Sequence, residues 1–205
     1  VGNTIQTSQR SGVVVRNTAD PTFRGNTFLS NAIAGIDVQD GAKGTFEKNI
    51  LRSNGQMGVN LQGSANGKVV FVKNVIELSP YGVHASDGAR ALVSRSTIRH
   101  CQTGVMAERT SAAAIVKNFI ESCVTAVTCT GEGTKGFFMY NSVRGNEETG
   151  FSVEDSAAPI LIGNTILGQK TGVFVLDESA PRLLYNIISF NSVAVDCARP
   201  NRAQL

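Results

Sequence analysis

The chain has 205 residues, 41% of them hydrophobic, and a formal net charge of +3 at pH 7. This apolar content excludes a disordered chain, and no apolar stretch reaches the ~20 residues that a membrane-spanning helix needs. The chain contains no dense run of Lys and Arg, so we expect neither a nucleic acid nor a membrane as partner.

Two markers recur along the chain in a fixed order. The first is an Asn, once replaced by Ser, with an aliphatic residue or Phe two positions later: Asn3, Asn26, Asn49, Asn74, Ser96, Asn118, Asn141, Asn164 and Asn186. Eight or nine residues further on, a Gly or Ala opens an alternating apolar segment: Gly12, Gly35, Gly58, Gly82, Gly104, Ala126, Gly150, Gly172 and Ala194. The markers define about nine copies of a 22–25-residue unit, so the chain is a repeat protein.

Each unit is expected to contain three short strands, because its apolar residues recur with period two. The first strand follows the Asn, and the second follows the Gly. In the second strand the residue after the Gly points inward: Val13, Ile36, Val59, Val83, Val105, Val127, Phe151, Val173 and Val195. A third strand precedes the next Asn, with inward residues Phe23, Phe46, Phe71, Val93, Ile115, Phe138, Leu161 and Leu183.

Stacked units of three strands form a solenoid. We therefore predict an all-β fold, a single-stranded right-handed parallel β-helix over residues 1–198 with a C-terminal tail over 199–205. The handedness follows from the usual chirality of parallel crossover connections. With roughly 4.8 Å per coil, the rod is on the order of 40 Å long.

Two polar columns are interpreted as structural. The marker Asn is expected to sit at a corner between strands, where it tolerates left-handed backbone angles and its amide bonds the equivalent amide one coil away. The second column lies five residues later: Ser8, Asn31, Asn54, Ser79, Cys101, Cys123, Asn146, Gln169 and Asn191. Such an asparagine ladder mimics a catalytic cluster without being one.

Acidic residues also align, five positions after the strand Gly, at Asp40, Asp87, Asp155 and Asp177. Each begins a turn, where an Asp most simply caps its own backbone. A carbohydrate-active site needs carboxylates gathered on one strand face for acid–base work or cation binding, and the sequence indicates no such column. We therefore assign no catalytic residue, no metal site and no cofactor.

Two columns of charged residues break the regularity. The residue before the corner Asn is basic in four consecutive units, at Lys48, Lys73, Arg95 and Lys117. Stacked about 5 Å apart, four like charges repel unless something neutralises them, so these residues are either a solvated edge or a docking strip for an acidic partner. Three residues after the corner, alternating signs predict an ion-pair ladder: Arg52, Glu77, Arg99, Glu121 and Arg144.

The four cysteines show no metal-site spacing. Cys101 and Cys123 are equivalent in neighbouring units, within reach of a disulfide, although stacked reduced thiols are favoured. Cys129 and Cys197 share a column three units apart and cannot bond each other. This cysteine usage suits a reducing compartment and thus a cytoplasmic location.

The segment Asn26-Thr27-Phe28-Leu29-Ser30-Asn31-Ala32-Ile33-Ala34-Gly35-Ile36-Asp37-Val38 resembles the β-helix repeat of the NosD-like family and of β-helix-bearing F-box proteins. The resemblance covers nearly the whole chain, but the matching residues are structural. In the F-box proteins this domain is thought to recognise protein partners, and the chain has no F-box motif.

Tyr81-Gly82-Val83-His84-Ala85-Ser86-Asp87 invites comparison with the Tyr-Gly-Phe-Asp-Pro-His segment of mannuronan epimerases. The chain has no Pro there, and Asp and His come in the opposite order. His84 is therefore interpreted as an ordinary outward side chain beside a turn.

Two functions from different classes follow from this sequence. The favoured one is a non-catalytic, rigid macromolecule-binding or scaffold module, which recognises a protein partner or joins a larger assembly through Lys48, Lys73, Arg95 and Lys117. The alternative is a carbohydrate-active enzyme, a polysaccharide lyase, hydrolase or uronate epimerase, with an acidic polysaccharide as partner. Three or more acidic residues converging on one outward face would favour the alternative.

Overall fold

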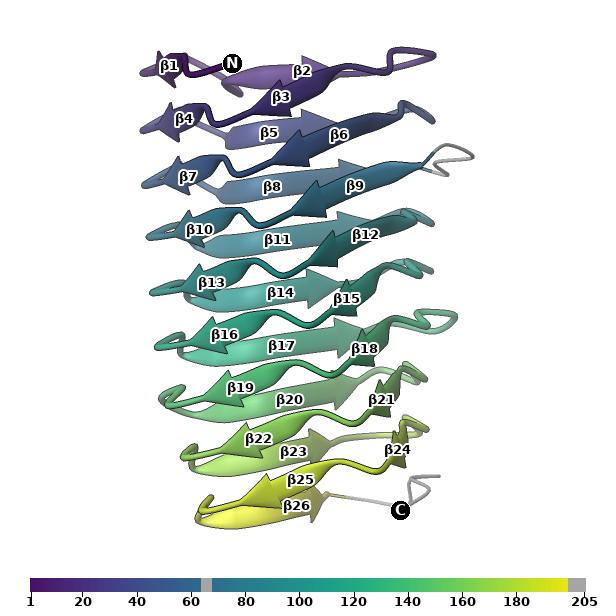
Figure 1. Cartoon of the computed structure of the whole chain (residues 1–205). Coiled ribbons are helices and arrows are strands. Elements are labelled where there is room, and N and C mark those ends of the chain that lie inside the picture. Colours follow the sequence, from purple (N-terminus) through teal and green to yellow (C-terminus); the bar gives the residue numbers. More distant parts are fainter. Residues whose placement is uncertain (64–67, 199–205) are drawn as a thin grey trace.

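The structure is a computed structural model that describes residues 1–63 and 68–198. In these ranges the chain forms strands and turns without a helix, and the strands wind into a parallel solenoid (Figure 1). The predicted parallel β-helix is confirmed, and the expected tail over 199–205 lies outside the described residues. Within the described part, no helix is long and apolar enough to cross a membrane.

Each coil contributes one strand to each of three sheets, called A, B and C. Sheet A contains β1 (Thr4–Gln6), β4 (Thr27–Leu29), β7 (Ile50–Arg52), β10 (Val75–Glu77), β13 (Thr97–Arg99), β16 (Phe119–Glu121), β19 (Ser142–Arg144), β22 (Thr165–Leu167) and β25 (Ile187–Ser189). Sheet B contains β2 (Val13–Val15), β5 (Ala34–Val38), β8 (Met57–Gln62), β11 (Tyr81–Ser86), β14 (Thr103–Ala107), β17 (Thr125–Thr130), β20 (Thr149–Glu154), β23 (Thr171–Val175) and β26 (Val193–Cys197). Sheet C contains β3 (Thr22–Arg24), β6 (Gly44–Glu47), β9 (Val69–Val72), β12 (Ala91–Ser94), β15 (Ala114–Val116), β18 (Phe137–Met139), β21 (Ile160–Ile162) and β24 (Arg182–Leu184).

The strands pair in the register of the repeat. Ile76 lies opposite Ile98 in sheet A, and Phe46 lies opposite Phe71 in sheet C. Within the described ranges, sheets A and B have nine strands each and sheet C has eight, so eight complete coils are followed by a ninth of two strands. This agrees with the predicted nine coils. Sheets A and C lie together in front of sheet B in Figure 1.

The core is built from the inward columns that the sequence predicted. Of the column after the Gly, seven members are fully buried: Ile36, Val59, Val83, Val105, Val127, Phe151 and Val173. In sheet C, Phe46 and Phe71 stack with ring centroids 4.3 Å apart. A fully buried side chain of this size contributes about 1.5–3 kcal/mol, and stacking like on like extends one core through all the coils.

The Gly that opens most strands of sheet B, replaced by Ala at positions 126 and 194, is favoured by close approach. A Cβ built on Gly104 would lie 2.6 Å from the carbonyl oxygen of Ala126 and 2.8 Å from Cγ2 of Ile120. The Gly therefore faces the interior, and the strand departs from strict in–out alternation at this point. As a consequence, the residue before the Gly and the second residue after it share the outward face.

The asparagine ladder is confirmed, but the expected backbone angle is wrong. The Asn141 amide donates to the Asn164 Oδ1 at 2.9 Å, and its own Oδ1 accepts from the Asn118 amide at 3.1 Å. The left-handed residue is instead the one before each Asn, such as Lys117 with φ 56°. The Asn is buried in the corner because the left-handed residue before it makes the bend.

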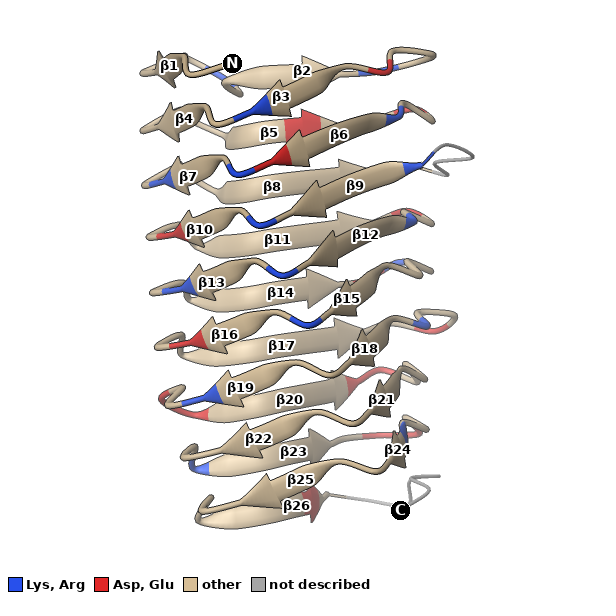
Figure 2. Cartoon of the chain, viewed as in Figure 1, with Lys and Arg blue, Asp and Glu red and all other residues tan. Residues whose placement is uncertain are grey.

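The charge ladder of sheet A is largely confirmed, and Figure 2 shows the alternating signs from β7 to β19. Glu77 pairs with Arg52 and, at 2.7 Å, with Arg99, and Glu121 pairs with Arg144 at 3.1 Å. Burial opposes ionisation of the Glu77 carboxyl, but the hydrogen bonds and charges of Arg99 and Arg52 prevail, so the pKa of Glu77 lies below its usual value.

All four cysteines are free thiols. Cys101 and Cys123 are buried in neighbouring coils at the corner between sheets A and B, where they line an open depression of about 430 Å³. Each thiol donates to a backbone carbonyl, Cys101 to that of Arg99 and Cys123 to that of Glu121. Interaction with the neighbouring thiol lowers the pKa of Cys101, and the same interaction together with burial raises the pKa of Cys123. Cys129 is fully buried, which raises the pKa of its thiol.

Candidate functional site

The outward face of sheet B brings together polar side chains from neighbouring coils. From β11, Tyr81 and His84 both point outward because Gly82 between them faces the core, and their ring centroids lie 5.8 Å apart. Asn60 in β8 is the register partner of His84, and Asp37 in β5 is the register partner of Asn60. The strands thus place Tyr81 and an Asp–Asn–His row side by side.

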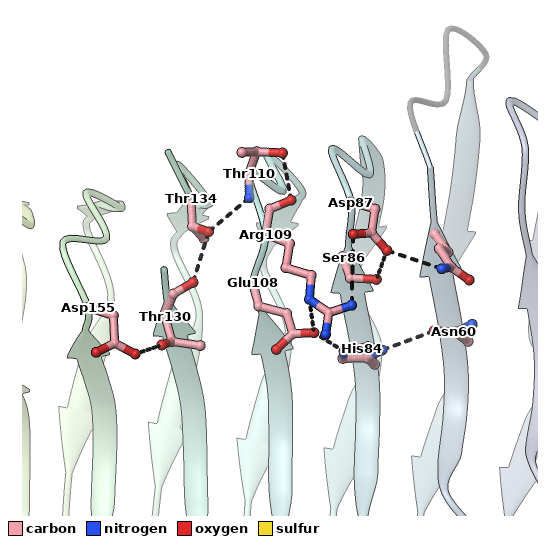
Figure 3. Close-up of polar contacts among 11 residues, drawn as sticks. Asn60, His84, Ser86, Asp87, Glu108, Arg109, Thr110, Thr130, Thr134 and Asp155 are labelled. Atoms are coloured by element: carbon pink, nitrogen blue, oxygen red, sulfur yellow. Dashed lines mark hydrogen bonds and ion pairs between the residues drawn. The ribbon is translucent and has the colours of Figure 1, made fainter. Parts of the chain in front are cut away.

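A continuous chain of polar contacts runs across four coils and is called the His84 cluster: Asp37, Asn60, His84, Glu108 and Arg109. Figure 3 shows the part from Asn60 to Arg109. The Asn60 Nδ2 donates to the Asp37 Oδ1 at 2.9 Å, and the Asn60 Oδ1 lies 3.0 Å from the His84 Nδ1. On the other side of the imidazole, the His84 Nε2 lies 3.3 Å from the Glu108 Oε1. The His84 side chain is only 17% exposed.

This geometry determines where protons lie. Asp37 is an acceptor that also receives the Gln39 side-chain amide at 2.8 Å, so the Asn60 Nδ2 must face it and the Asn60 Oδ1 must face His84. An amide oxygen only accepts, and therefore the His84 Nδ1 carries a hydrogen. The second contact places the His84 Nε2 3.3 Å from the Glu108 Oε1, so a proton that arrives on this nitrogen meets a carboxylate acceptor. The cluster therefore places two groups that can exchange a proton next to each other.

The guanidinium of Arg109 completes the cluster on the solvent side. Its Nε lies 3.5 Å from the Glu108 Oε1, and its Nη1 lies 3.9 Å from the Asp87 Oδ1. These contacts are loose, and 67% of the Arg109 side chain is exposed. Arg109 can therefore turn to an anionic ligand at little cost, because exposed ion pairs of this kind contribute less than about 1 kcal/mol.

Further carboxylates lie on the same face of sheet B. In β20, Glu154 accepts from the Ser152 hydroxyl at 2.5 Å. At the turn that follows, Asp155 accepts from the Thr130 hydroxyl at 2.6 Å. Asp37, Glu108 and Glu154 thus stand on strands or strand ends of sheet B, in separate coils, and only Asp37 and Glu108 belong to one chain of contacts.

The acidic residues were missed because they alternate between columns. Asp37 stands two positions after its Gly, whereas Glu108 and Glu154 stand four positions after theirs. A search along one column finds only two acids, yet both columns face outward, and Asp37 and Glu108 are connected through Asn60 and His84. His84 points outward beside a turn, as expected, and both of its ring nitrogens also contact polar side chains of neighbouring coils, which the sequence did not predict.

The four predicted binding residues lie elsewhere. Lys48, Lys73, Arg95 and Lys117 are exposed at the corner between sheets C and A, across the coil from the His84 cluster. The turn residues Asp40, Asp87, Asp155 and Asp177 follow the strands of sheet B in left-handed conformation, with φ from 51° to 58°. Among residues 1–63 and 68–198, no three His, Cys, Asp or Glu side chains are grouped closely enough to hold a metal ion.

The comparisons with known proteins agree with this architecture. The family model described as a right-handed β-helix region matches residues 1–90 and 66–201 of the sequence, so the chain belongs to the right-handed β-helix family. No match was found among curated proteins.

Solved structures with the same fold include alginate epimerases. A single-site mutant of the periplasmic alginate epimerase AlgG matches with a TM-score of 0.71 and 13% identity, over 95% of this chain and 56% of that chain. AlgG itself matches with a TM-score of 0.65 and 15% identity over 84% and 55%. The A-module of the Azotobacter vinelandii mannuronan C-5 epimerase AlgE6 matches with a TM-score of 0.53 and 16% identity over 93% and 57%. The chain thus spans just over half the length of each of these proteins.

Proposed function

We propose that the chain is the β-helix of a carbohydrate-active protein that binds an acidic polysaccharide across the outward face of sheet B. The proposed chemistry is proton transfer at the ring carbon next to the carboxylate of a uronate residue. The observation that carries the proposal is the His84 cluster, in which an imidazole nitrogen lies 3.3 Å from a carboxylate oxygen on an outward face. The structural similarity to alginate epimerases supports the same class of substrate.

The residues present supply the groups that this reaction needs. Removal of the C5 proton breaks the C–H bond, moves the proton to a base and leaves a negative charge that spreads onto the neighbouring carboxylate. In its neutral form His84 keeps its hydrogen on Nδ1, where Asn60 accepts it, and offers Nε2 as the proposed base that takes the C5 proton; Glu108 beside Nε2 then stabilises the imidazolium that forms. Tyr81 lies beside it as a second proton donor or acceptor. Arg109 offers the cation that the uronate carboxylate requires.

Two outcomes share this first step. Return of a proton to the opposite side of C5 gives the epimer. Cleavage of the C4–O glycosidic bond, with a proton passing to the leaving oxygen, gives instead the C4–C5 unsaturated product of a lyase and a shortened chain. Hydrolysis is less well supported, because it needs one free acid and one free base on opposite sides of the glycosidic bond. In this cluster Asp37 is occupied by the amide groups of Asn60 and Gln39.

The experiment compares wild-type protein with His84→Gln on polymannuronate, with the product followed by proton NMR. We expect His84→Gln to lower the rate by at least about 100-fold, the usual contribution of a general acid–base group. The control is His100→Gln, which changes the other histidine of the chain, an exposed residue at the corner between sheets A and B. Equal rates for wild type and His84→Gln would contradict the proposal.

The non-catalytic macromolecule-binding or scaffold module is the second candidate. It is favoured by the four exposed basic residues Lys48, Lys73, Arg95 and Lys117, which have no part in the His84 cluster. In that case a protein partner or a larger assembly would occupy a surface of the solenoid, and His84→Gln would leave its affinity unchanged. The two candidates differ in turnover, which only the first requires.

A further inference from the structure

The corner between sheets C and A carries a continuous column of outward side chains that the His84 cluster does not use. In chain order its members are Lys48, Lys73, Arg95, Lys117, Tyr140, Gly163 and Tyr185, and they are called the corner strip. Figure 2 shows the basic part as a row of blue at the turns between β6 and β7, β9 and β10, β12 and β13, and β15 and β16.

The backbone holds the corner strip in register. Each member from Lys48 to Gly163 donates its N–H to the coil that follows, as in Lys73 to the Ser94 carbonyl at 3.0 Å, Arg95 to the Val116 carbonyl at 3.2 Å and Lys117 to the Met139 carbonyl at 2.9 Å. The side chains are therefore spaced by the coil repeat of roughly 4.8 Å. Because the backbone of the corner strip is already fixed, it loses no conformational entropy when a ligand binds.

The fold does not need these cations. Every basic member has left-handed backbone angles, with φ from 50° to 56°, which cost energy for a residue with a side chain. Gly25 and Gly163 occupy the same column without a side chain. Within the described residues, Lys48 has a weak ion pair with Glu47 at 4.0 Å, whereas Lys73, Arg95 and Lys117 have no carboxylate within that distance.

Aromatic side chains continue the corner strip beyond its basic residues. Tyr140 is 58% exposed, and its ring covers the bare backbone of Gly163, where an added Cβ would lie 2.7 Å from the Tyr140 Cδ1. Tyr185, two coils further, is 91% exposed. An aromatic face next to a row of cations suits a polymer that combines flat apolar faces with regularly spaced negative charges.

We infer that the corner strip binds a linear acidic polysaccharide, with successive carboxylates on Lys73, Arg95 and Lys117 and a sugar ring on Tyr140. One coil repeat is comparable to the length of one sugar residue, so a uronate chain lying along the solenoid meets one cation per sugar. This surface lies across the coil from the His84 cluster and holds the polymer without chemistry. The inference is independent of the proposed catalysis.

The test measures affinity for uronate oligomers by isothermal titration calorimetry. For wild-type protein we expect affinity to rise with length until about four sugars span the four cations, and to fall at least about tenfold between ~50 and ~200 mM salt. The variant Lys73→Glu/Arg95→Glu/Lys117→Glu should bind roughly 100-fold more weakly. Tyr140→Ala should weaken binding severalfold without changing the salt dependence.

The matched control is Lys43→Glu/Arg90→Glu/Lys135→Glu, which makes the same change in net charge at exposed residues outside the corner strip. It should leave affinity within about twofold of wild type, and circular dichroism checks that both triple variants are folded. Equal losses in the two triple variants would overturn the inference, because binding would then follow net charge alone. Poly-glutamate or single-stranded DNA of equal charge binding as tightly as the uronate would overturn it as well.

The outcome is separable from the proposed function. Both ideas would be supported if His84→Gln lost turnover and if Lys73→Glu/Arg95→Glu/Lys117→Glu bound the polymer more weakly than the control triple variant. Normal turnover in a Lys73→Glu/Arg95→Glu/Lys117→Glu protein that binds the polymer as tightly as wild type would contradict the inference about the corner strip only.

Discussion

At the scale of single residues, Glu77 illustrates how a charge is tolerated in the wall of the solenoid. It is only 2% exposed, yet it is ionised because Arg52 and Arg99 approach it from the coils on either side. A buried carboxylate without such partners would be costly. The alternation of charge signs along sheet A is therefore a structural device, and the sequence alone predicted it.

Replacing Glu77 should reveal this device. We expect Glu77→Gln to lower the free energy of unfolding by about 1–3 kcal/mol near neutral pH, because two guanidinium groups lose a buried charged acceptor. Since the pKa of Glu77 is lowered in the folded state, its contribution is complete above the ordinary Glu pKa of about 4.3 and is lost as the pH falls through the folded pKa.

Urea unfolding of wild type and Glu77→Gln at neutral and acidic pH measures this difference. The control is Glu121→Gln, because Glu121 has one arginine partner, Arg144, and a more exposed side chain. That change should cost less, about 0.2–1 kcal/mol. A Glu77 effect that stays constant as the pH falls would contradict the account.

At the scale of elements, the strands of each sheet are very short, and the corner ladders hold them in place. Asn141 connects three coils, because its amide donates to the Ile115 carbonyl at 2.8 Å and to Asn164, while its oxygen accepts from Asn118. In one coil Ser96 occupies the same column, and its hydroxyl accepts the Asn74 N–H at 3.1 Å. A hydroxyl can thus satisfy part of the ladder.

This internal substitution predicts an order of stabilities. Asn141→Leu should destabilise the protein by several kcal/mol, because each buried group left without a partner costs about 1–3 kcal/mol. Asn141→Ser should cost clearly less, since a short hydroxyl can take over one contact. Thermal and urea unfolding of the two variants measures the order, and a more stable Leu variant would show that the amide ladder is not what holds the corner.

The strands and corners were predictable because each follows from a local residue pattern, and this pattern recurs in about nine units of the chain. The columns of Gly and Asn report close approach and amide ladders, and the repeated positions then place every inward residue. The backbone angle at the corner was predicted for the wrong residue, because Asn is the usual left-handed residue, whereas in this protein the bend lies one position earlier, at residues such as Lys117.

The His84 cluster was not predictable in the same way. Its members come from four coils and from three outward positions, and none of them repeats: the residues aligned with His84 are Asn60 and Met106. They come together because Gly82 faces the core, which lets Tyr81 and His84 share the outward face, and because the side chains of Asn60 and Glu108 contact His84 from the neighbouring coils. The clue available in the sequence was the set of outward positions taken together instead of column by column.

At the scale of the whole molecule, the solenoid separates two chemistries on opposite sides. Sheet B carries carboxylates, an imidazole and a phenol in hydrogen-bond contact or close proximity, which suits proton transfer. The corner between sheets C and A carries cations and aromatic rings at the coil repeat, which suits holding a polymer. Because the solenoid is rigid, a ligand on one side need not disturb the other, and variants of the two surfaces should act additively.

The central claim is that the face around His84 transfers protons to and from a uronate. It is tested most directly by incubating wild-type protein with polymannuronate in D₂O and following the C5 proton signal by NMR. The account predicts that deuterium replaces the C5 proton, and that His84→Gln abolishes the exchange while His100→Gln does not. A wild-type protein that binds the polymer without any exchange at C5 would contradict it and leave the solenoid as a binding module.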